Sequence, residues 1–140
     1  MLFRSIARQA DRLASIIEDL LALSRIEQSE GTGNLPRETV RIADLLSAVT
    51  VDCRPRADDR SIRLDVTCDE SIAAEVNAPL VEQALINLVD NAIKYSDPGR
   101  TVWITVTPLV GQPDGDAVLV TVRDEGCGIE AEHLPRLFER

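Results

Sequence analysis

The segment Leu85–Tyr95, which reads LINLVDNAIKY, constrains the fold of this 140-residue chain more than any other. Asn87 and Asn91 lie one helical turn apart in it, so their amides project in nearly the same direction, close to Lys94. Asparagine is a mediocre helix former, so the aligned pair is either a solvated edge of the helix or part of a ligand site. Apolar residues at steps of three and four predict one core-facing stripe, made of Leu80, Val81, Ala84, Leu85, Leu88, Val89, Ala92 and Ile93.

A second motif follows some thirty residues later. The β-branched segment Val118–Val122 predicts a strand, and after it come Asp124, Gly126, Gly128 and Ile129. Glycines allow close approaches that a side chain forbids, and an acidic residue at a strand end can accept a hydrogen bond from an amino group. Alone, D-x-G-x-G is a weak signal, and it is not the dinucleotide-binding fingerprint.

Together, N-x-x-x-N-A-x-K-Y followed by D-x-G-x-G-I closely resembles the ATP-binding domain of bacterial sensor histidine kinases, within them the phosphate-sensor type. The two motifs match the N box and the G1 box, and Leu137–Arg140 looks like the opening of the F box. Ser5–Glu27 resembles the second helix of the dimerisation and phosphoacceptor domain. The resemblance implies part of that domain at residues 1–28, a linker at 29–37, and a C-terminally truncated ATP-binding catalytic domain at 38–140.

The resemblance also implies a role for each motif residue, with ATP and Mg²⁺ as the bound species. Asn91 matches the metal-binding asparagine, whose neutral amide oxygen suits Mg²⁺. Lys94 resembles the phosphate-contacting lysine, Tyr95 the aromatic along adenine, and Asp124 the acceptor for the exocyclic amine of adenine. The implied nucleotide-binding residues are Asn87, Lys94, Tyr95, Asp124, Gly126, Gly128 and Ile129.

Asn87 stands where ATPases of the wider superfamily, such as DNA gyrase, carry a glutamate that activates water. An amide cannot act as a base, so the resemblance implies transfer of the γ-phosphoryl group to a histidine and then to an aspartate of a response regulator. His133, the single histidine, is interpreted as a solvated loop residue. The phosphoacceptor is therefore expected outside this chain, and the chain alone is expected to be inactive.

Two alternatives stay open. A stand-alone superfamily ATPase, or a serine kinase of the anti-sigma type, would carry the same motifs, but the kinase-like N-terminal helix argues against it. A non-catalytic interaction module is a serious alternative for the 140 residues as they stand.

Charge and composition exclude other classes of protein. The net charge of −9 argues against a nucleic-acid partner. No run of eighteen apolar residues is present, so no membrane contact is expected in this segment, and no secretion signal is visible. Three widely spaced cysteines predict reduced thiols. We therefore expect the chain in the cytoplasm, whether or not its parent protein is anchored in a membrane.

Periodicity predicts an α+β fold. The N-terminal helix carries a coiled-coil-like seam, made of Ile6, Ala10, Leu13, Ile17, Leu20 and Ser24. The seam predicts packing against another helix or against a second copy of the chain in a homodimer, and the alternative is a helix folded onto its own domain. Strands are expected near residues 38–42, 62–67, 73–76, 101–107 and 116–123, the last two as a hairpin. A helix near 43–53 should stop at Pro55, and Asn77 and Pro79 should begin the next one. These elements predict a two-layer α/β sandwich after a long dimerisation helix, in agreement with the Bergerat fold of the histidine kinases.

Overall fold

The computed structural model describes residues 2–30, 35–126 and 128. The chain divides into two compact units, residues 1–37 and 38–140, which are described separately. The first unit contains helix α1, Leu2–Glu30. Six large apolar side chains of α1 are 44–60% exposed, namely Ile6, Leu13, Ile16, Ile17, Leu20 and Leu21. The expected N-terminal helix is therefore present, and its large apolar side chains are exposed.

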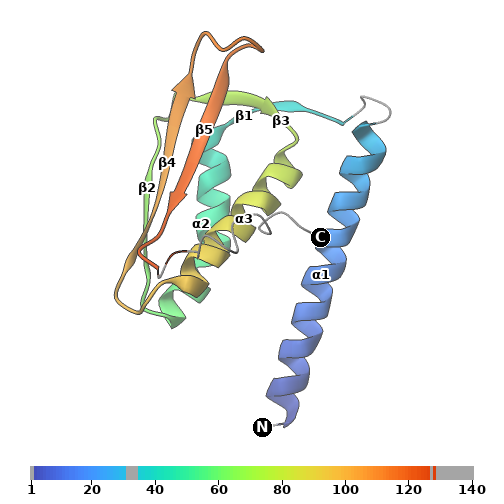
Figure 1. Cartoon of the computed structure of the whole chain (residues 1–140), viewed down its shortest axis with the longest axis vertical. Helices are drawn as coiled ribbons and strands as arrows, with labels where there is room; N and C mark the ends of the chain where they lie inside the picture. The colour runs from blue at the N-terminus through green and yellow to red at the C-terminus, as the bar shows by residue number, and fades with distance from the viewer. Residues whose placement is uncertain (1, 31–34, 127, 129–140) are drawn as a thin grey trace. The chain divides into compact units, whose positions relative to one another are not determined.

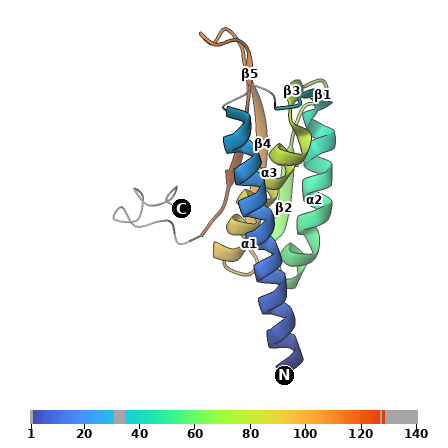
Figure 2. The same ribbon diagram turned by 90° about the vertical axis from the view of Figure 1, so that its right-hand side faces the viewer.

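The second unit is a two-layer α/β sandwich (Figure 1). Its elements are β1 (Glu38–Arg41), α2 (Ile42–Asp59), β2 (Arg63–Thr67), β3 (Ala73–Val76), α3 (Ala78–Tyr95), β4 (Thr101–Leu109) and β5 (Ala117–Arg123). Strands β2, β4 and β5 form one sheet in that order, while β1 and β3 form a separate antiparallel pair. Helices α2 and α3 lie side by side on one face of the three-stranded sheet (Figure 2). The predicted α+β class and layer arrangement are confirmed.

The three-stranded sheet combines a parallel pair with a hairpin. Strands β4 and β5 are antiparallel, as the predicted hairpin requires. Strand β2 runs parallel to β4, with Arg63 opposite Thr101. Because a parallel pair needs a crossover connection, the chain between these strands passes through α3 on the covered face of the sheet (Figure 1).

The core lies between the two helices and the sheet. Val102 and Ile104 of β4 are 0% exposed and face the helices, because alternate side chains of a strand point to the same side. Val49 of α2 and Val89 of α3 are equally buried. Partly buried residues of β2 and β5 complete this face, namely Leu64, Val118, Val120 and Val122.

Helix α2 does not stop at Pro55, so the expected end of this helix was wrong. Pro55 lies inside the helix, which continues to Asp59. Proline costs an intrahelical hydrogen bond, but Cys53 and Ala57, one turn apart on either side of it, are 0% and 1% exposed. Burial of this last turn against the core offsets the lost bond.

Helix α3 begins as predicted. The Oδ1 atom of Asn77 accepts a hydrogen bond from the Leu80 N–H at 3.1 Å, and Pro79 lies in the first turn. The predicted apolar stripe is only partly correct, because Ala84 and Leu88 are exposed, Leu88 by 52%. The buried side is narrower and comprises Leu85, Val89, Ala92 and Ile93.

Candidate functional site

The polar residues of the N-box motif lie together on the exposed side of α3. Asn87, Asn91 and Lys94 are all exposed, whereas Val89 and Ile93 between them are buried. This arrangement follows from the helical period, which places residues three and four apart on one side. The structure therefore presents two amides and one ammonium group on a single exposed surface of the helix.

Lys94 and Tyr95 contact each other at the C-terminal end of α3. The Lys94 Nζ atom lies 5.3 Å from the centre of the Tyr95 ring, within the range of a cation–π interaction. The ring itself is 57% exposed. An exposed aromatic ring beside a cation can lie against a flat aromatic group while the cation attracts an anion.

The turn after β5 is organised by Asp124. Its Oδ1 atom accepts a hydrogen bond from the Gly126 N–H at 2.8 Å, and the carboxylate is otherwise exposed. Gly128 has φ of +76°, a conformation that favours glycine. The carboxylate thus keeps accepting capacity for a further donor, since a carboxylate can accept about four hydrogen bonds.

Gly126 brings this turn into contact with the end of α3. A Cβ atom at residue 126 would lie 2.5 Å from the Tyr95 carbonyl oxygen and 2.9 Å from Asp124 Oδ1. Both separations are below any ordinary contact, so only glycine fits here. The close approach juxtaposes the two motifs, which are thirty residues apart in the sequence.

Two residues that the sequence analysis missed hold the end of α3. Arg60 follows α2 and donates from Nε to the Ile93 carbonyl and from Nη2 to the Ser96 carbonyl, both at 3.1 Å. Ser96 is 2% exposed, and its Oγ donates to the Ala92 carbonyl at 2.7 Å. No local signal reveals the two Arg60 bonds, because Arg60 and its acceptors are more than thirty residues apart.

An ion pair ties the middle of α3 to α2. Arg56 donates from Nε to Asp90 at 2.7 Å and from Nη2 to Asp52 at 2.5 Å. Partial burial opposes the charge of Arg56, but the two carboxylates prevail and raise its pKa above the usual value. Burial, together with the charge of Asp90, raises the pKa of the neighbouring Cys53 thiol to about 11. Asp90 directly precedes Asn91, so the pair fixes the helix next to the predicted metal ligand.

Some predicted positions lie outside the described residues. They are Cys127, Ile129, His133 and Leu137–Arg140. Within residues 2–30, 35–126 and 128, no group of three or more His, Cys, Asp or Glu side chains could hold a metal ion. The helices in the same ranges include none long and apolar enough to cross a membrane.

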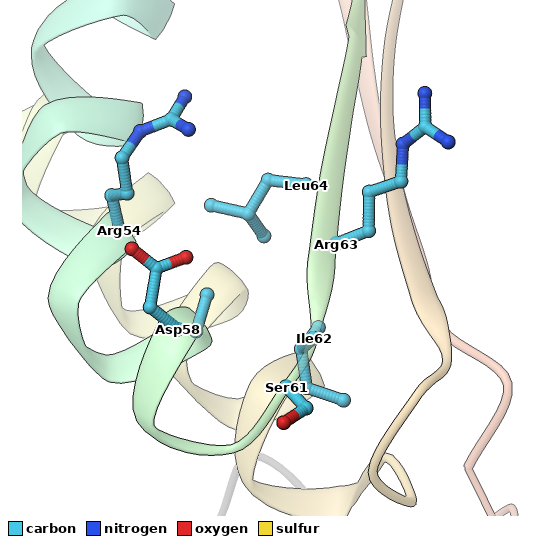
Figure 3. Close-up of a pocket in the computed structure, with 7 residues that line it drawn as sticks. Arg54, Asp58, Ser61, Ile62, Arg63 and Leu64 are labelled. Carbon is cyan, nitrogen blue, oxygen red and sulfur yellow. The ribbon is translucent and has the colours of Figure 1, made fainter.

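A cavity of about 410 Å³ lies elsewhere, between α2 and β2. Figure 3 shows Leu64 pointing from β2 toward α2, where Arg54 and Asp58 lie. None of the predicted nucleotide-binding residues lines this cavity. The described members of that set lie instead on the surface shared by α3 and the turn after β5.

Comparisons with known proteins give relatives for nearly the whole chain. Residues 76–140 match the family of histidine kinase-, DNA gyrase B- and HSP90-like ATPases. The sensor protein IrlS of Burkholderia pseudomallei is 33% identical over 129 residues, which are 92% of this chain and 26% of IrlS. The histidine kinase AdeS of Acinetobacter baumannii superposes with a TM-score of 0.74 at 31% identity, covering 95% of this chain and 64% of AdeS.

Full-length ShkA in complex with AMPPNP superposes with a TM-score of 0.70 at 25% identity, covering 92% of this chain and 27% of ShkA. The chain thus spans about a quarter of the length of IrlS and of ShkA. The second unit has the Bergerat fold of histidine kinase ATPase domains, as predicted. Residues 76–140 carry an ATPase domain of the histidine kinase-, DNA gyrase B- and HSP90-like family, and over nearly all of its length the chain is similar to part of the sensor histidine kinases.

Proposed function

We propose that the exposed side of α3 and the turn after β5 form a Mg-ATP site. Tyr95 lies along the adenine ring, and Asp124 accepts a hydrogen bond from the exocyclic amine. Lys94 contacts the phosphates, and Asn87 contributes its amide beside them. Gly126 and Gly128 approach the nucleotide through their backbone, and Ile129, which lies outside the described residues, is a further proposed contact. The observation that carries this proposal is the contact between Gly126 and the Tyr95 carbonyl, which unites the two motifs.

Asn91 is the proposed Mg²⁺ ligand. Its side chain is exposed, one turn from Asn87, and a neutral amide oxygen is a suitable hard ligand. No acidic cluster among the described residues competes for the ion, which fits a metal held mainly by phosphate oxygens and water. When bound, Mg²⁺ would neutralise charge on the phosphates.

In the parent protein, the γ-phosphoryl group of ATP passes to a histidine outside this chain and then to an aspartate of a response regulator. The amide of Asn87 cannot deprotonate water, which favours transfer to a protein group over hydrolysis. Phosphoryl transfer needs positioning and charge stabilisation from the protein. Asn87, Asn91 and Lys94, aligned along one helix, can supply both.

Helix α1 is the proposed dimerisation element, as part of a domain at residues 1–28 that a linker at 29–37 joins to the catalytic domain at 38–140. Its exposed apolar stripe supports this role, because each such side chain gains about 1.5–3 kcal/mol on burial. Cys53 and Cys68 are free thiols, which supports a cytoplasmic location.

Nucleotide titrations of wild type and three variants test this proposal. Wild type should bind ATP more tightly with Mg²⁺ than with EDTA, and Asn91→Ala should lose this difference. Asp124→Asn should lose the preference for ATP over GTP in both conditions, because an amide replaces part of the accepting group. Asp114→Asn, in the exposed turn between β4 and β5, is the matched control and should bind like wild type.

Two results would contradict the proposal. One is a wild-type chain that binds no adenine nucleotide, which would favour a non-catalytic interaction module. The other is an Asp124→Asn variant that keeps full preference for adenine.

A further inference from the structure

The end of α3 carries two proposed nucleotide contacts, Lys94 and Tyr95, on its last two residues. The last carbonyl groups of any helix lack partners within the helix. At this end the Ile93 and Ser96 carbonyls accept from Arg60, so the two bonds stand on either side of Lys94 and Tyr95. The rigid planar guanidinium fixes the spacing of these two carbonyls.

The carbonyl between these two anchors points elsewhere. Tyr95 presents its oxygen to Gly126, at a separation that leaves no room for a Cβ atom. A displacement of residues 93–96 toward the turn after β5 would press the Tyr95 carbonyl oxygen against the Gly126 backbone. A displacement of these residues away from that turn would separate Tyr95 from Asp124. The position of the segment therefore sets the distance between the adenine-contacting ring and the adenine-accepting carboxylate.

Neighbouring bonds fasten Arg60 to the same region. The Ser61 carbonyl accepts from the Gly99 N–H at 2.8 Å, and the Arg63 N–H donates to the Arg100 carbonyl at 3.0 Å. Ser61 has φ of +56°, an uncommon value for a residue other than glycine, where the chain turns sharply after Arg60. Together with the bond from Arg60 to Ser96, these contacts hold the α2–β2 turn against both ends of the loop 96–100 that follows α3.

We propose that Arg60 is a positioning residue of the nucleotide site, which holds Lys94 and Tyr95 against the turn that carries Asp124. This inference rests on the proposed function and adds a residue that touches no substrate. Arg60 acts through the backbone of residues 93–96 and not through its charge at the nucleotide.

Three variants of the chain test the proposal. Arg60→Met removes the donors and keeps a long side chain, whereas Arg60→Lys keeps donors for the carbonyls. Arg54→Met is the matched control, since Arg54 is an exposed arginine of α2, the helix that Arg60 follows, and lines the cavity in Figure 3. All proteins are compared at a temperature where Trp103 fluorescence reports a folded chain.

Amide hydrogen exchange without nucleotide is the first measurement. Arg60→Met should speed exchange of the Ser96 and Gly126 amides about tenfold, by local opening of this contact. Arg60→Lys and Arg54→Met should leave both amides within about twofold of wild type. Unchanged exchange at Gly126 in Arg60→Met would overturn the proposal.

The affinity for Mg-ATP is the second measurement. Arg60→Met should bind Mg-ATP about tenfold more weakly, and Arg60→Lys should recover most of this lost affinity. A loss of affinity caused only by lower stability would not be recovered in this way. Wild-type affinity in Arg60→Met would also overturn the proposal. A wild-type chain without nucleotide binding refutes the proposed function instead, and the exchange measurement alone then decides whether Arg60 holds the segment.

Discussion

The Cys53 thiol should make the folded chain sensitive to alkaline pH. Cys53 is 0% exposed in the core. Burial, and then the negative charge of Asp90, disfavour the thiolate, although the Arg56 guanidinium at 3.6 Å from Sγ opposes them. The pKa rises from an ordinary 9.0 to about 11. The folded chain therefore keeps the thiol proton in a range of pH where the unfolded chain has lost it.

The sign of the effect follows from proton linkage. Between pH 9 and 11 the native state binds more protons than the unfolded state, so the free energy of unfolding falls as the pH rises. Below pH 9 both states hold the proton and the contribution is fully present. With these two pKa values, the loss is about 1.4 kcal/mol at pH 10 and about 2.3 kcal/mol at pH 11.

Urea unfolding followed by Trp103 fluorescence measures this effect from pH 7.5 to 11. Wild type and Cys53→Ala are compared at each pH, because every other titrating group then cancels. Cys53→Ala should be less stable at neutral pH, since it leaves a small cavity. As the pH rises, the difference in free energy of unfolding between the two proteins should shrink by the amounts given above for pH 10 and pH 11. Cys68→Ala should show a much smaller change, because that thiol is partly exposed. A constant difference between wild type and Cys53→Ala across the whole range would refute the reasoning.

Three further predictions concern other parts of the chain. Gly126→Ala should weaken Mg-ATP binding about tenfold in a nucleotide titration, since its Cβ overlaps the Tyr95 carbonyl; unchanged affinity would contradict the close approach. Asn77→Ala should lower the free energy of unfolding by about 1 kcal/mol in urea, through loss of the cap on Leu80, and no change would show the cap to be dispensable. The Ile17→Glu, Leu20→Glu double variant should be monomeric in analytical ultracentrifugation at concentrations where wild type dimerises, because charges replace exposed apolar contacts; equal masses would exclude α1 from the dimer interface.

Local signals were sufficient for much of the fold. Asn77 and Pro79 marked the start of α3 through capping chemistry that needs no partner from elsewhere. The β4–β5 hairpin was predictable because alternating apolar residues flank a turn-rich segment. Long-range effects were not predictable in this way. Pro55 is tolerated because Ala57, beyond it, is buried by other elements, and the parallel pairing of β2 with β4 has no local signature.

The candidate site also combines features that local signals predicted with features that depend on long-range contacts. The resemblance to a known family supplied the roles proposed for Asn91, Lys94, Tyr95 and Asp124, and these roles stay predictions. Their alignment on α3 followed from helical spacing alone. The Arg60 bonds depend on two helices meeting at one end, so only a three-dimensional structure could reveal them.

The strand order β2-β4-β5 has a consequence for how the chain folds. During synthesis, α2 and α3 emerge before β4, and their apolar sides have no sheet to cover until Val102 and Ile104 arrive. The β4–β5 hairpin closes a short loop, whereas pairing β2 with β4 closes a long one, which costs more entropy. We therefore expect the hairpin to gain protection early in pulse-labelled hydrogen exchange and β2 to gain it last. Simultaneous protection of β2 and β5 would argue instead that the whole sheet forms in one step.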